Sequence, residues 1–253
     1  MLSLNKIKYL KSLSLKKNRI KEKKVILDGR RLIDEAINQN VKFEHIWISD
    51  SLREKEIDSI FIKKIKENKI NFSYEKENDL KKISNAKNSQ GILALISVDT
   101  LYNQDLNFFD NQLIILDQVS DPGNLGTILR TCAWFGIKSI ILSENSTDIF
   151  NDKCIRSSVG GHFFIDNLTY LSYDNINKFL NSNNYIILCA DLRGEKINNK
   201  YIQNKWALIL GSEAHGINNQ LKFDKKITIN KKGKMESLNV SVATGIILNK
   251  LVN

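Results

Sequence analysis

The stretch Asp117-Gln-Val-Ser-Asp-Pro-Gly-Asn-Leu-Gly-Thr-Ile-Leu-Arg130 joins an apolar segment to a helical pattern. Pro122 and Gly123 predict a sharp turn, and Asn124 is a candidate N-cap for the helix that follows. Pro122 is the only proline in the 253 residues, and it stands in a loop directly after an expected strand. The stretch therefore predicts a strand, a tight turn and a helix, which together form the repeating unit of a parallel α/β sheet.

The same alternation of apolar strands and amphipathic helices covers residues 112–253. The expected strands are Leu113–Val119, Ser139–Ser143, Phe163–Leu168, Tyr185–Ala190, Ala207–Leu210 and Lys226–Ile229. The expected helices are Leu125–Phe135, Asp152–Val159, Asn175–Leu180 and Val240–Leu251. We therefore predict an α/β domain over residues 112–253, built on a parallel sheet with helices on both faces.

Residues 1–98 predict a separate, small α/β domain. It begins with a short basic helix over Tyr9–Arg19, and two longer helices are expected over Arg30–Gln39 and Arg53–Glu67. The expected strands are Val25–Asp28, Phe43–Ser49, Asn71–Glu75 and the near-continuous apolar run Gly91–Val98. Residues 99–111 are polar with scattered aromatic side chains and no clean period, so we place a linker there.

The positive charge of the chain is concentrated in this first domain. Residues 1–97 carry 22 Lys and Arg against 13 Asp and Glu, whereas residues 98–253 carry 16 against 15. Such a local excess is typical of phosphate binding, and a nucleic-acid partner is the favoured interpretation. The alternatives are a solvated lysine-rich face and, more weakly, a mitochondrial transit peptide, which would need more arginine than Arg19 alone among residues 1–24.

Several other protein classes are disfavoured. No apolar run approaches the roughly 18 residues that span a bilayer, and no apolar core follows the first lysines, so we expect neither a membrane protein nor a secretory signal. Three cysteines cannot pair completely and stand in apolar surroundings, which indicates a reduced, cytoplasmic protein. The three histidines lack the spacing of metal ligands, so we expect no metal site.

Arg130 makes the first stretch a candidate anion site. It follows Asn124 by six residues, and a helix N-terminus with a nearby arginine suits a phosphate. The alternative is an ordinary strand, turn and helix with a surface arginine. Neither the glycine fingerprint of dinucleotide-binding folds nor a phosphate-binding Gly-Lys-Ser/Thr loop is present.

A second polar segment, Leu210-Gly-Ser-Glu-Ala-His-Gly-Ile217, also follows an expected strand. Ligands of parallel α/β sheets bind at such carboxyl ends. Glu213 stands between two glycines, where a carboxylate accepts hydrogen bonds from an arginine or from ribose hydroxyls. His215 is a candidate base, but nothing adjacent orients it, so a solvated loop histidine is the favoured interpretation.

A third segment, Glu236-Ser-Leu-Asn-Val-Ser-Val-Ala-Thr-Gly-Ile-Ile-Leu-Asn-Lys250, opens the last expected helix. Ser237 and Asn239 are both capping residues, and capping alone would explain either of them. The Ser-Leu-Asn order places the two polar side chains on one side and Leu238 on the other. That arrangement suits a pocket with an apolar wall and hydrogen-bonding groups.

The segments Asn124–Arg130, Gly211-Ser-Glu-Ala-His-Gly216 and Glu236-Ser-Leu-Asn-Val-Ser-Val-Ala243 resemble, in order, three motifs of the SpoU/TrmH-type RNA ribose methyltransferases of the SPOUT superfamily. The resemblance covers residues 112–253, and three ordered motifs are far more specific than any one of them. Residues 1–97 look like the ribosomal-protein-like RNA-binding domain often found ahead of this catalytic domain.

The resemblance implies a deep trefoil knot in the C-terminal part of the sheet, which would hold S-adenosylmethionine in a bent shape, and a homodimer whose site is shared across the interface. The implied catalytic residues are Asn124, Arg130, Glu213, Ser237 and Asn239. The implied cofactor-binding residues are Ala190, Gly211, Ile229 and Leu238. Relatives commonly show Ile-Pro-Met where this chain has Ile229-Asn230-Lys231, which alters the wall on the adenine side.

The expected function is S-adenosylmethionine-dependent methylation of a ribose 2′-hydroxyl. Large-subunit ribosomal RNA is the favoured substrate, and transfer RNA is the alternative. A non-catalytic RNA-binding ribosome assembly factor of the same fold is the rival from another class. The sulfonium leaving group needs no metal. Because a guanidinium stays protonated, we expect Arg130 to bind phosphate and developing alkoxide, with Ser237 or a water relaying the proton and with Asn124 and Glu213 holding Arg130.

Overall fold

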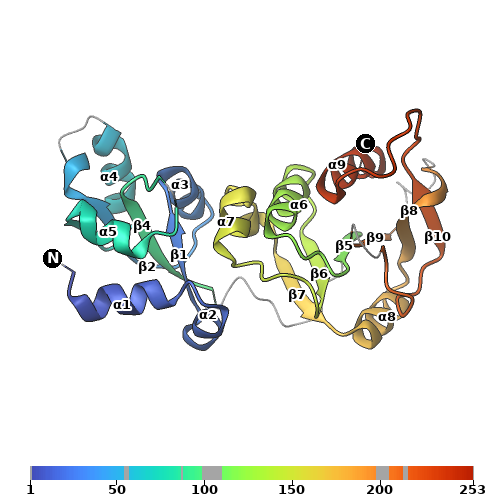
Figure 1. The fold of residues 1–253 in the computed structure, drawn as a ribbon, viewed down its shortest axis with the longest axis horizontal. Helices are drawn as coiled ribbons and strands as arrows, with labels where there is room; N and C mark the ends of the chain where they lie inside the picture. The colour runs from blue at the N-terminus through green and yellow to red at the C-terminus, as the bar shows by residue number, and fades with distance from the viewer. Residues whose placement is uncertain are drawn as a thin grey trace.

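The computed structural model describes residues 2–53, 57–86, 88–98, 110–197, 205–212 and 216–252, without the side chains of residues 57–59. Within these residues the chain forms two α/β units, each with its own sheet (Figure 1). The predicted linker at 99–111 lies almost wholly outside the described residues, so the domain boundaries stay predictions. No helix in the described part is long and apolar enough to cross a membrane.

The N-terminal unit is a four-stranded mixed sheet. Its strands, in spatial order, are β1 (Lys24–Asp28), β4 (Ile92–Ser97), β2 (Phe43–Ser49) and β3 (Phe72–Glu75). β4 runs antiparallel to both of its neighbours, and β2 and β3 run parallel. The helices are α1 (Leu4–Ser12), α2 (Lys16–Glu22), α3 (Arg30–Asn38), α4 (Ile57–Glu67) and α5 (Glu77–Ile83), with a short 3₁₀ turn η1 (Asp50–Leu52).

Helices cover both faces of this sheet, and the strand residues alternate between the faces. Trp47 and Leu95 pack with Leu10 of α1 and Leu80 of α5. The neighbouring residues of the same strands, such as Ile46, pack on the opposite face in the cluster that contains α3 and α4. Every residue of β4 is buried, as predicted for a strand covered on both faces.

The prediction of one basic helix over Tyr9–Arg19 is wrong. The chain breaks between α1 and α2, and Leu13 at the break is buried in the apolar cluster. Arg19 turns back to donate hydrogen bonds to the carbonyl oxygens of Leu13 and Ser14. These bonds take up carbonyls that a continuous helix would have used itself. The short helix α5 was missed, because only Leu80 and Ile83 among its seven residues are buried.

The C-terminal unit is a six-stranded sheet in which every pairing is parallel, which confirms the predicted class. Its spatial order is β10 (Lys225–Thr228), β8 (Ile186–Lys196), β9 (Trp206–Leu210), β5 (Gln112–Leu116), β6 (Ser139–Ser143) and β7 (Asn167–Leu171). Its helices are α6 (Pro122–Trp134), α7 (Asp152–Ser158), α8 (Tyr173–Ser182) and α9 (Val240–Leu251). The apolar residues of α6, α7 and α9 pack on one face and those of α8 on the other.

The predicted strand Phe163–Leu168 is placed too early in the chain. Gly161–Phe164 forms a 3₁₀ turn, η2, and the strand begins only at Asn167. The reason is the buried side chain of His162, which bonds to Ser158 Oγ at 2.7 Å and to the carbonyl oxygen of Ile149 at 2.6 Å. Burial lowers the pKa of His162 to about 4, so the ring is neutral and structural.

Gly126 allows α6 and α7 to pack closely. A methyl group on its Cα would collide with Ser157 Oγ and the carbonyl oxygen of Cys154, and would lie 2.9 Å from the backbone nitrogen of Ser158. The glycine therefore lets the backbone of α7 lie directly against α6.

Gly126→Ala is expected to lower the free energy of unfolding by about 1–3 kcal/mol, because the backbone of α7 must move to accept the methyl group. Urea unfolding followed by circular dichroism measures this. Gly245→Ala in α9 is the matched control, since its new methyl group would meet only Thr131 Cγ2 at 3.8 Å. That control should gain about 0.5–1 kcal/mol from helix propensity. Equal stability of both variants would contradict the packing argument.

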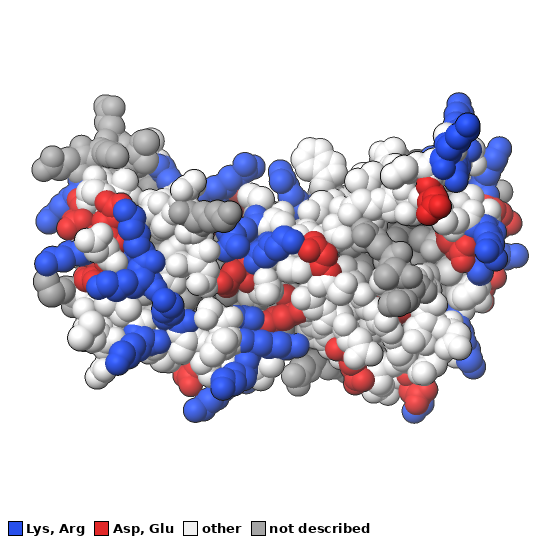
Figure 2. Space-filling model, in the orientation of Figure 1, with Lys and Arg blue, Asp and Glu red and all other residues white. Residues whose placement is uncertain are grey.

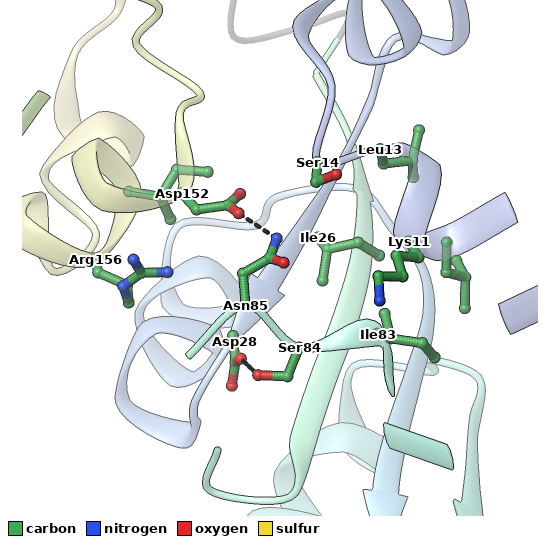
Figure 3. Close-up of a pocket in the computed structure, with 12 residues that line it drawn as sticks. Lys11, Leu13, Ser14, Ile26, Asp28, Ile83, Ser84, Asn85, Asp152 and Arg156 are labelled. Atoms are coloured by element: carbon green, nitrogen blue, oxygen red, sulfur yellow. Dashed lines mark hydrogen bonds between the residues drawn. The ribbon is translucent and has the colours of Figure 1, made fainter. Parts of the chain in front are cut away.

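The two units share one continuous apolar cluster, and polar side chains also join them. Arg19 of α2 donates to Asp148 Oδ2 at 2.5 Å, and Asn85 after α5 donates to Asp152 at the start of α7 (Figure 3). A cavity of about 20 Å³ lies beside the second contact, where Asp28 and Arg156 also line the junction. Burial raises the pKa of Asp28.

Candidate active site

Two helices present their N-termini side by side at the candidate site, and a hydrogen bond joins them. The Nδ2 of Asn239 donates to Oδ1 of Asn124 at 2.9 Å, although the residues are 115 positions apart. Asn239 is the N-cap of α9, and its Oδ1 accepts from the backbone nitrogen and the hydroxyl of Ser241 at 3.0 and 2.6 Å. The fold therefore brings together two of the predicted site residues, from the first and third motifs, on helices that lie next to each other in Figure 1.

The sequence suggested Asn124 as the N-cap of α6, but the structure shows that it is not the cap. The helix begins at Pro122, and Asp121 caps it by accepting from the backbone nitrogen of Asn124 at 2.8 Å. The hydrogen bond from Lys153, at 2.7 Å, and the cap hydrogen bond lower the pKa of Asp121. Because Asp121 supplies the cap, the side-chain amide of Asn124 is directed to α9 and not to its own helix.

Arg130 lies on a different side of α6. Six residues at about 100° each place it about 120° away from Asn124 around the helix axis. The side of Asn124 continues through Thr131, which lies next to Gly245 of α9. Arg130 is exposed, and among the described residues no hydrogen bond or ion pair holds its guanidinium. A single chain thus brings Asn124, but not Arg130, to Asn239.

The other predicted catalytic residues are only partly described. Ser237 is exposed in the loop ahead of α9, and Leu238 beside it has 46% of its surface exposed. Glu213 and His215 lie outside the described residues, so their positions stay predictions. Among the residues that the structure does describe, no group of three or more His, Cys, Asp or Glu is placed to hold a metal ion.

Three of the four predicted cofactor-binding residues lie where pairings of three neighbouring strands end. Ala190 is the first residue of β8 beyond its pairing with β9, Gly211 follows β9, and Ile229 follows β10. Ala190 and Ile229 are half-buried and pack against the main core. A Cβ on Gly211 would collide with the carbonyl group of Gly216. The backbone at this edge is therefore closely folded, as a site that binds through backbone groups requires.

Asp117 is a site-forming residue that the motif analysis passed over. It is fully buried at the end of β5, and its two carboxylate oxygens accept from the hydroxyl of Tyr173 at 3.0 Å and from the backbone nitrogen of Asn218 at 2.7 Å. Asn218 closes the loop that follows β9. The buried carboxylate of Asp117 thus holds Asn218, the residue directly after the second motif, by a hydrogen bond.

Asp117→Asn is expected to lower the free energy of unfolding by about 2 kcal/mol, because asparagine has one acceptor oxygen where the carboxylate has two, so either the Tyr173 hydroxyl or the Asn218 backbone nitrogen loses its acceptor. Urea unfolding measures the loss. Asp166→Asn, at an exposed ion pair with Lys138, is the matched control and should change little. If the two variants are equally stable, Asp117 does not hold the loop.

Comparison with known proteins agrees with this geometry. The SpoU rRNA Methylase family model matches residues 111–249, and the MRM3-like substrate binding domain matches residues 5–94. The 23S rRNA (guanosine(2553)-2'-O)-methyltransferase RlmP of Bacillus subtilis is 27% identical over 97% of this chain and 95% of its own. An uncharacterized tRNA/rRNA methyltransferase of Mycoplasma genitalium is 31% identical over 88% of this chain and 94% of its own.

One further relative matches over part of its length, and a solved structure shares the fold of the chain. An uncharacterized tRNA/rRNA methyltransferase of Borreliella burgdorferi is 35% identical over 54% of this chain, and the match spans 61% of that relative. A solved structure assigned to the TrmH family, from Porphyromonas gingivalis, superposes with a TM-score of 0.82 at 27% identity and covers 99% of this chain and 98% of its own. Because the family model covers more than half of the sequence, the chain belongs to the SpoU rRNA methylase family.

Proposed function

We propose that this chain methylates a ribose 2′-hydroxyl of RNA with S-adenosylmethionine as the donor, and that large-subunit ribosomal RNA is its substrate. The observation that carries the proposal is the hydrogen bond between Asn124 and Asn239, which joins two family motifs at adjacent helix N-termini. The ribosomal RNA target is supported by RlmP, whose name specifies a 2'-O-methylation of 23S rRNA and which aligns with this chain over 95% of its length.

The strand ends fit the cofactor. S-adenosylmethionine, when bound, supplies a methyl group on a sulfonium that is already an excellent leaving group. Ala190, Gly211 and Ile229 line the edge where the ladders of β8, β9 and β10 end, and Leu238 offers an exposed apolar side chain near the start of α9. Backbone groups at the glycine and apolar contact from the other residues would hold the cofactor there.

Polar residues of the chain would bind the RNA phosphate, stabilise the developing alkoxide and accept the hydroxyl proton. The N-termini of α6 and α9 carry partial positive charge, which favours a phosphate or a developing alkoxide nearby. Asn124 and Asn239 fix each other's orientation beside these N-termini. Arg130 would stabilise the phosphate and the alkoxide, and Ser237 or a water would take the hydroxyl proton. Alignment of the 2′-oxygen supplies much of the rate, up to about 7–11 kcal/mol in well-oriented reactions.

We also infer a homodimer whose site is shared. Within one chain Arg130 points away from Asn239, so a second copy is needed to bring an arginine to the asparagine pair. The helices that carry these residues also expose large apolar side chains, with 86% of Trp134 and 50% of Val242 accessible. The surface over α6 and α9 is largely free of charge (Figure 2). An exposed apolar surface of this kind suits contact with a second copy.

The knot and the compartment are further parts of the proposal. β10 pairs on the outer side of β8, beyond β9, and the chain then returns to pack α9 against α6. Such a return is what a C-terminal trefoil knot would require. The three buried cysteines and a ribosomal substrate support a cytoplasmic enzyme.

Two measurements test the function. Calorimetry should show S-adenosylmethionine binding, and its absence at millimolar cofactor would favour the non-catalytic assembly factor. Mapping of 2′-O-methyl sites in RNA from cells with and without the gene should show one site in large-subunit ribosomal RNA lost. Loss of a transfer-RNA site would establish the alternative substrate, and an unchanged map would reject the proposal.

A further inference from the structure

A groove of about 510 Å³ opens on the N-terminal unit, between α1 and one face of the sheet. The match to a substrate binding domain covers residues 5–94 but names no binding groove within them. Charged, aromatic and hydrogen-bonding side chains line it together, from α1 and from all four strands. They include Lys6, Tyr9, Lys24, His45, Trp47 and Glu75, with Ser73 between His45 and Glu75.

The inner wall of the groove is a hydrogen-bonded chain of three side chains. The hydroxyl of Ser73 donates to Oε1 of Glu75 at 3.1 Å, and its oxygen lies 3.0 Å from Nε2 of His45. Since the serine hydrogen is directed to the carboxylate, His45 must donate from Nε2. Burial and the nearby Lys6 lower the pKa of His45, so Nδ1 of the neutral ring is left as an acceptor. A nucleophilic serine would donate its hydrogen bond to the histidine instead. The His45–Ser73–Glu75 series is therefore suited to binding a ligand and not to nucleophilic catalysis.

Aromatic rings and ammonium groups lie next to this wall. The Nζ of Lys6 lies 5.4 Å from the ring centre of Tyr9 and 5.9 Å from that of Trp47. The rings of His45 and Trp47 are 4.9 Å apart. Lys24, which pairs with Glu44 at 3.2 Å, contributes a second ammonium group. Rings beside lysines are the combination that stacks an unpaired base and contacts its phosphates.

We propose that this groove binds an unpaired nucleotide of the RNA substrate, with the base against Tyr9 and its amino group donating to the wall formed by Glu75 and Ser73. The inference rests on the proposed function for the identity of the substrate. The buried carboxylate, with 7% of Glu75 exposed, favours a base with an exocyclic amino group, because carboxylates accept from the cytosine N4 amino group. The lysines contact the flanking phosphates.

The test is binding of fluorescein-labelled hexacytidylate and hexauridylate by the full chain, without cofactor, followed by anisotropy. The cytidine hexamer should bind about tenfold more tightly than the uridine hexamer. Glu75→Gln should remove that preference, and Glu67→Gln, at an exposed pair with Lys63, is the matched control that should keep it. No binding of either hexamer at millimolar concentration, or an unchanged preference in Glu75→Gln, would overturn the proposal.

The aromatic contact is tested with two variants of Tyr9. Tyr9→Leu should lower the affinity for both hexamers about tenfold, because stacking on the ring is lost, whereas Tyr9→Phe should bind them as tightly as the parent protein. If Tyr9→Leu proves unstable, photo-crosslinking of a 5-iodocytidine hexamer to the parent protein replaces it, with crosslinks expected at Tyr9, His45 or Trp47 and crosslinks confined to other segments contradicting the groove.

Failure of the groove and failure of the proposed function give different results. If RNA is methylated but the groove variants bind the hexamers like the parent, only the groove proposal fails. If hexamer binding responds to Glu75 and Tyr9 but no methyl group is transferred to any RNA, the nucleotide site stands and the proposed methyl transfer is wrong.

Discussion

Arg130→Ala is expected to lower kcat for methyl transfer about 100- to 1,000-fold, which is the range for removing one group that stabilises developing charge. The affinity for S-adenosylmethionine should stay unchanged, because Arg130 lies on α6 and not at the strand ends where the cofactor residues lie. Single-turnover transfer of a tritiated methyl group to the RNA measures the rate, and calorimetry measures the affinity.

Lys138→Ala controls for the loss of one positive charge in the same unit. Lys138 is exposed, pairs with Asp166 and precedes the amino end of β6, at the edge of the sheet opposite the candidate site. It should keep the parent rate. An Arg130→Ala rate within a few fold of the control would remove Arg130 from the active site.

Arg130→Lys separates the two roles that the guanidinium could have. An ammonium still offers a positive charge but titrates near pH 10.4, whereas a guanidinium stays protonated. If Arg130 only binds phosphate and alkoxide, the lysine variant should be slower, and its rate should fall further as the pH rises through the lysine pKa and the positive charge is lost. A rate that instead rises to near normal through the lysine pKa would show that the group at this position acts as a base.

The sequence predicted the C-terminal unit well, because its signals are local. The buried run at Ser139–Ser143 has the observed bounds of β6, and Asn239 caps α9 where the motif placed it. A buried strand or a helix cap depends on a few consecutive residues, so its position can be determined from the sequence.

The errors arose where a distant residue decides the local structure. The break between α1 and α2 depends on Arg19, whose ion-pair partner Asp148 is 129 positions away. The misplaced strand at residues 163–168 depends on His162, which is held by the carbonyl oxygen of Ile149. Such contacts leave no periodic signal. The pairing of Asn124 with Asn239 was accessible only through the shared strand-end position and the family resemblance.

Asp117 shows the same limit within the site itself. A single aspartate at the end of an apolar strand has no distinctive pattern, and its acceptors become meaningful only when Tyr173 and Asn218 are placed beside it. Catalytic motifs are therefore easier to find in a sequence than the buried groups that hold their loops.

Asp148→Asn is expected to lower the free energy of unfolding by about 3–5 kcal/mol, the cost of leaving a buried charge without its partner. Arg19 is 5% exposed and Asp148 is 11% exposed, and the ion pair joins the two units at 2.5 Å. The asparagine oxygen can still accept from the backbone nitrogen of Phe150, as Asp148 Oδ1 does at 3.0 Å, so the loss reports the charge. Urea unfolding measures it.

The double variant Arg19→Met with Asp148→Asn should regain part of this stability, because it removes the stranded guanidinium and keeps an apolar chain of similar length, while the carbonyl oxygens of Leu13 and Ser14 lose their donor. Asp166→Asn, at the exposed pair with Lys138, should cost less than about 1 kcal/mol. The ion pair connects the N-terminal unit, proposed to bind RNA, to the C-terminal unit. Asp148→Asn should therefore also raise KM for RNA while kcat changes little. A loss no larger than that of Asp166→Asn would show that the two units are held together by other contacts.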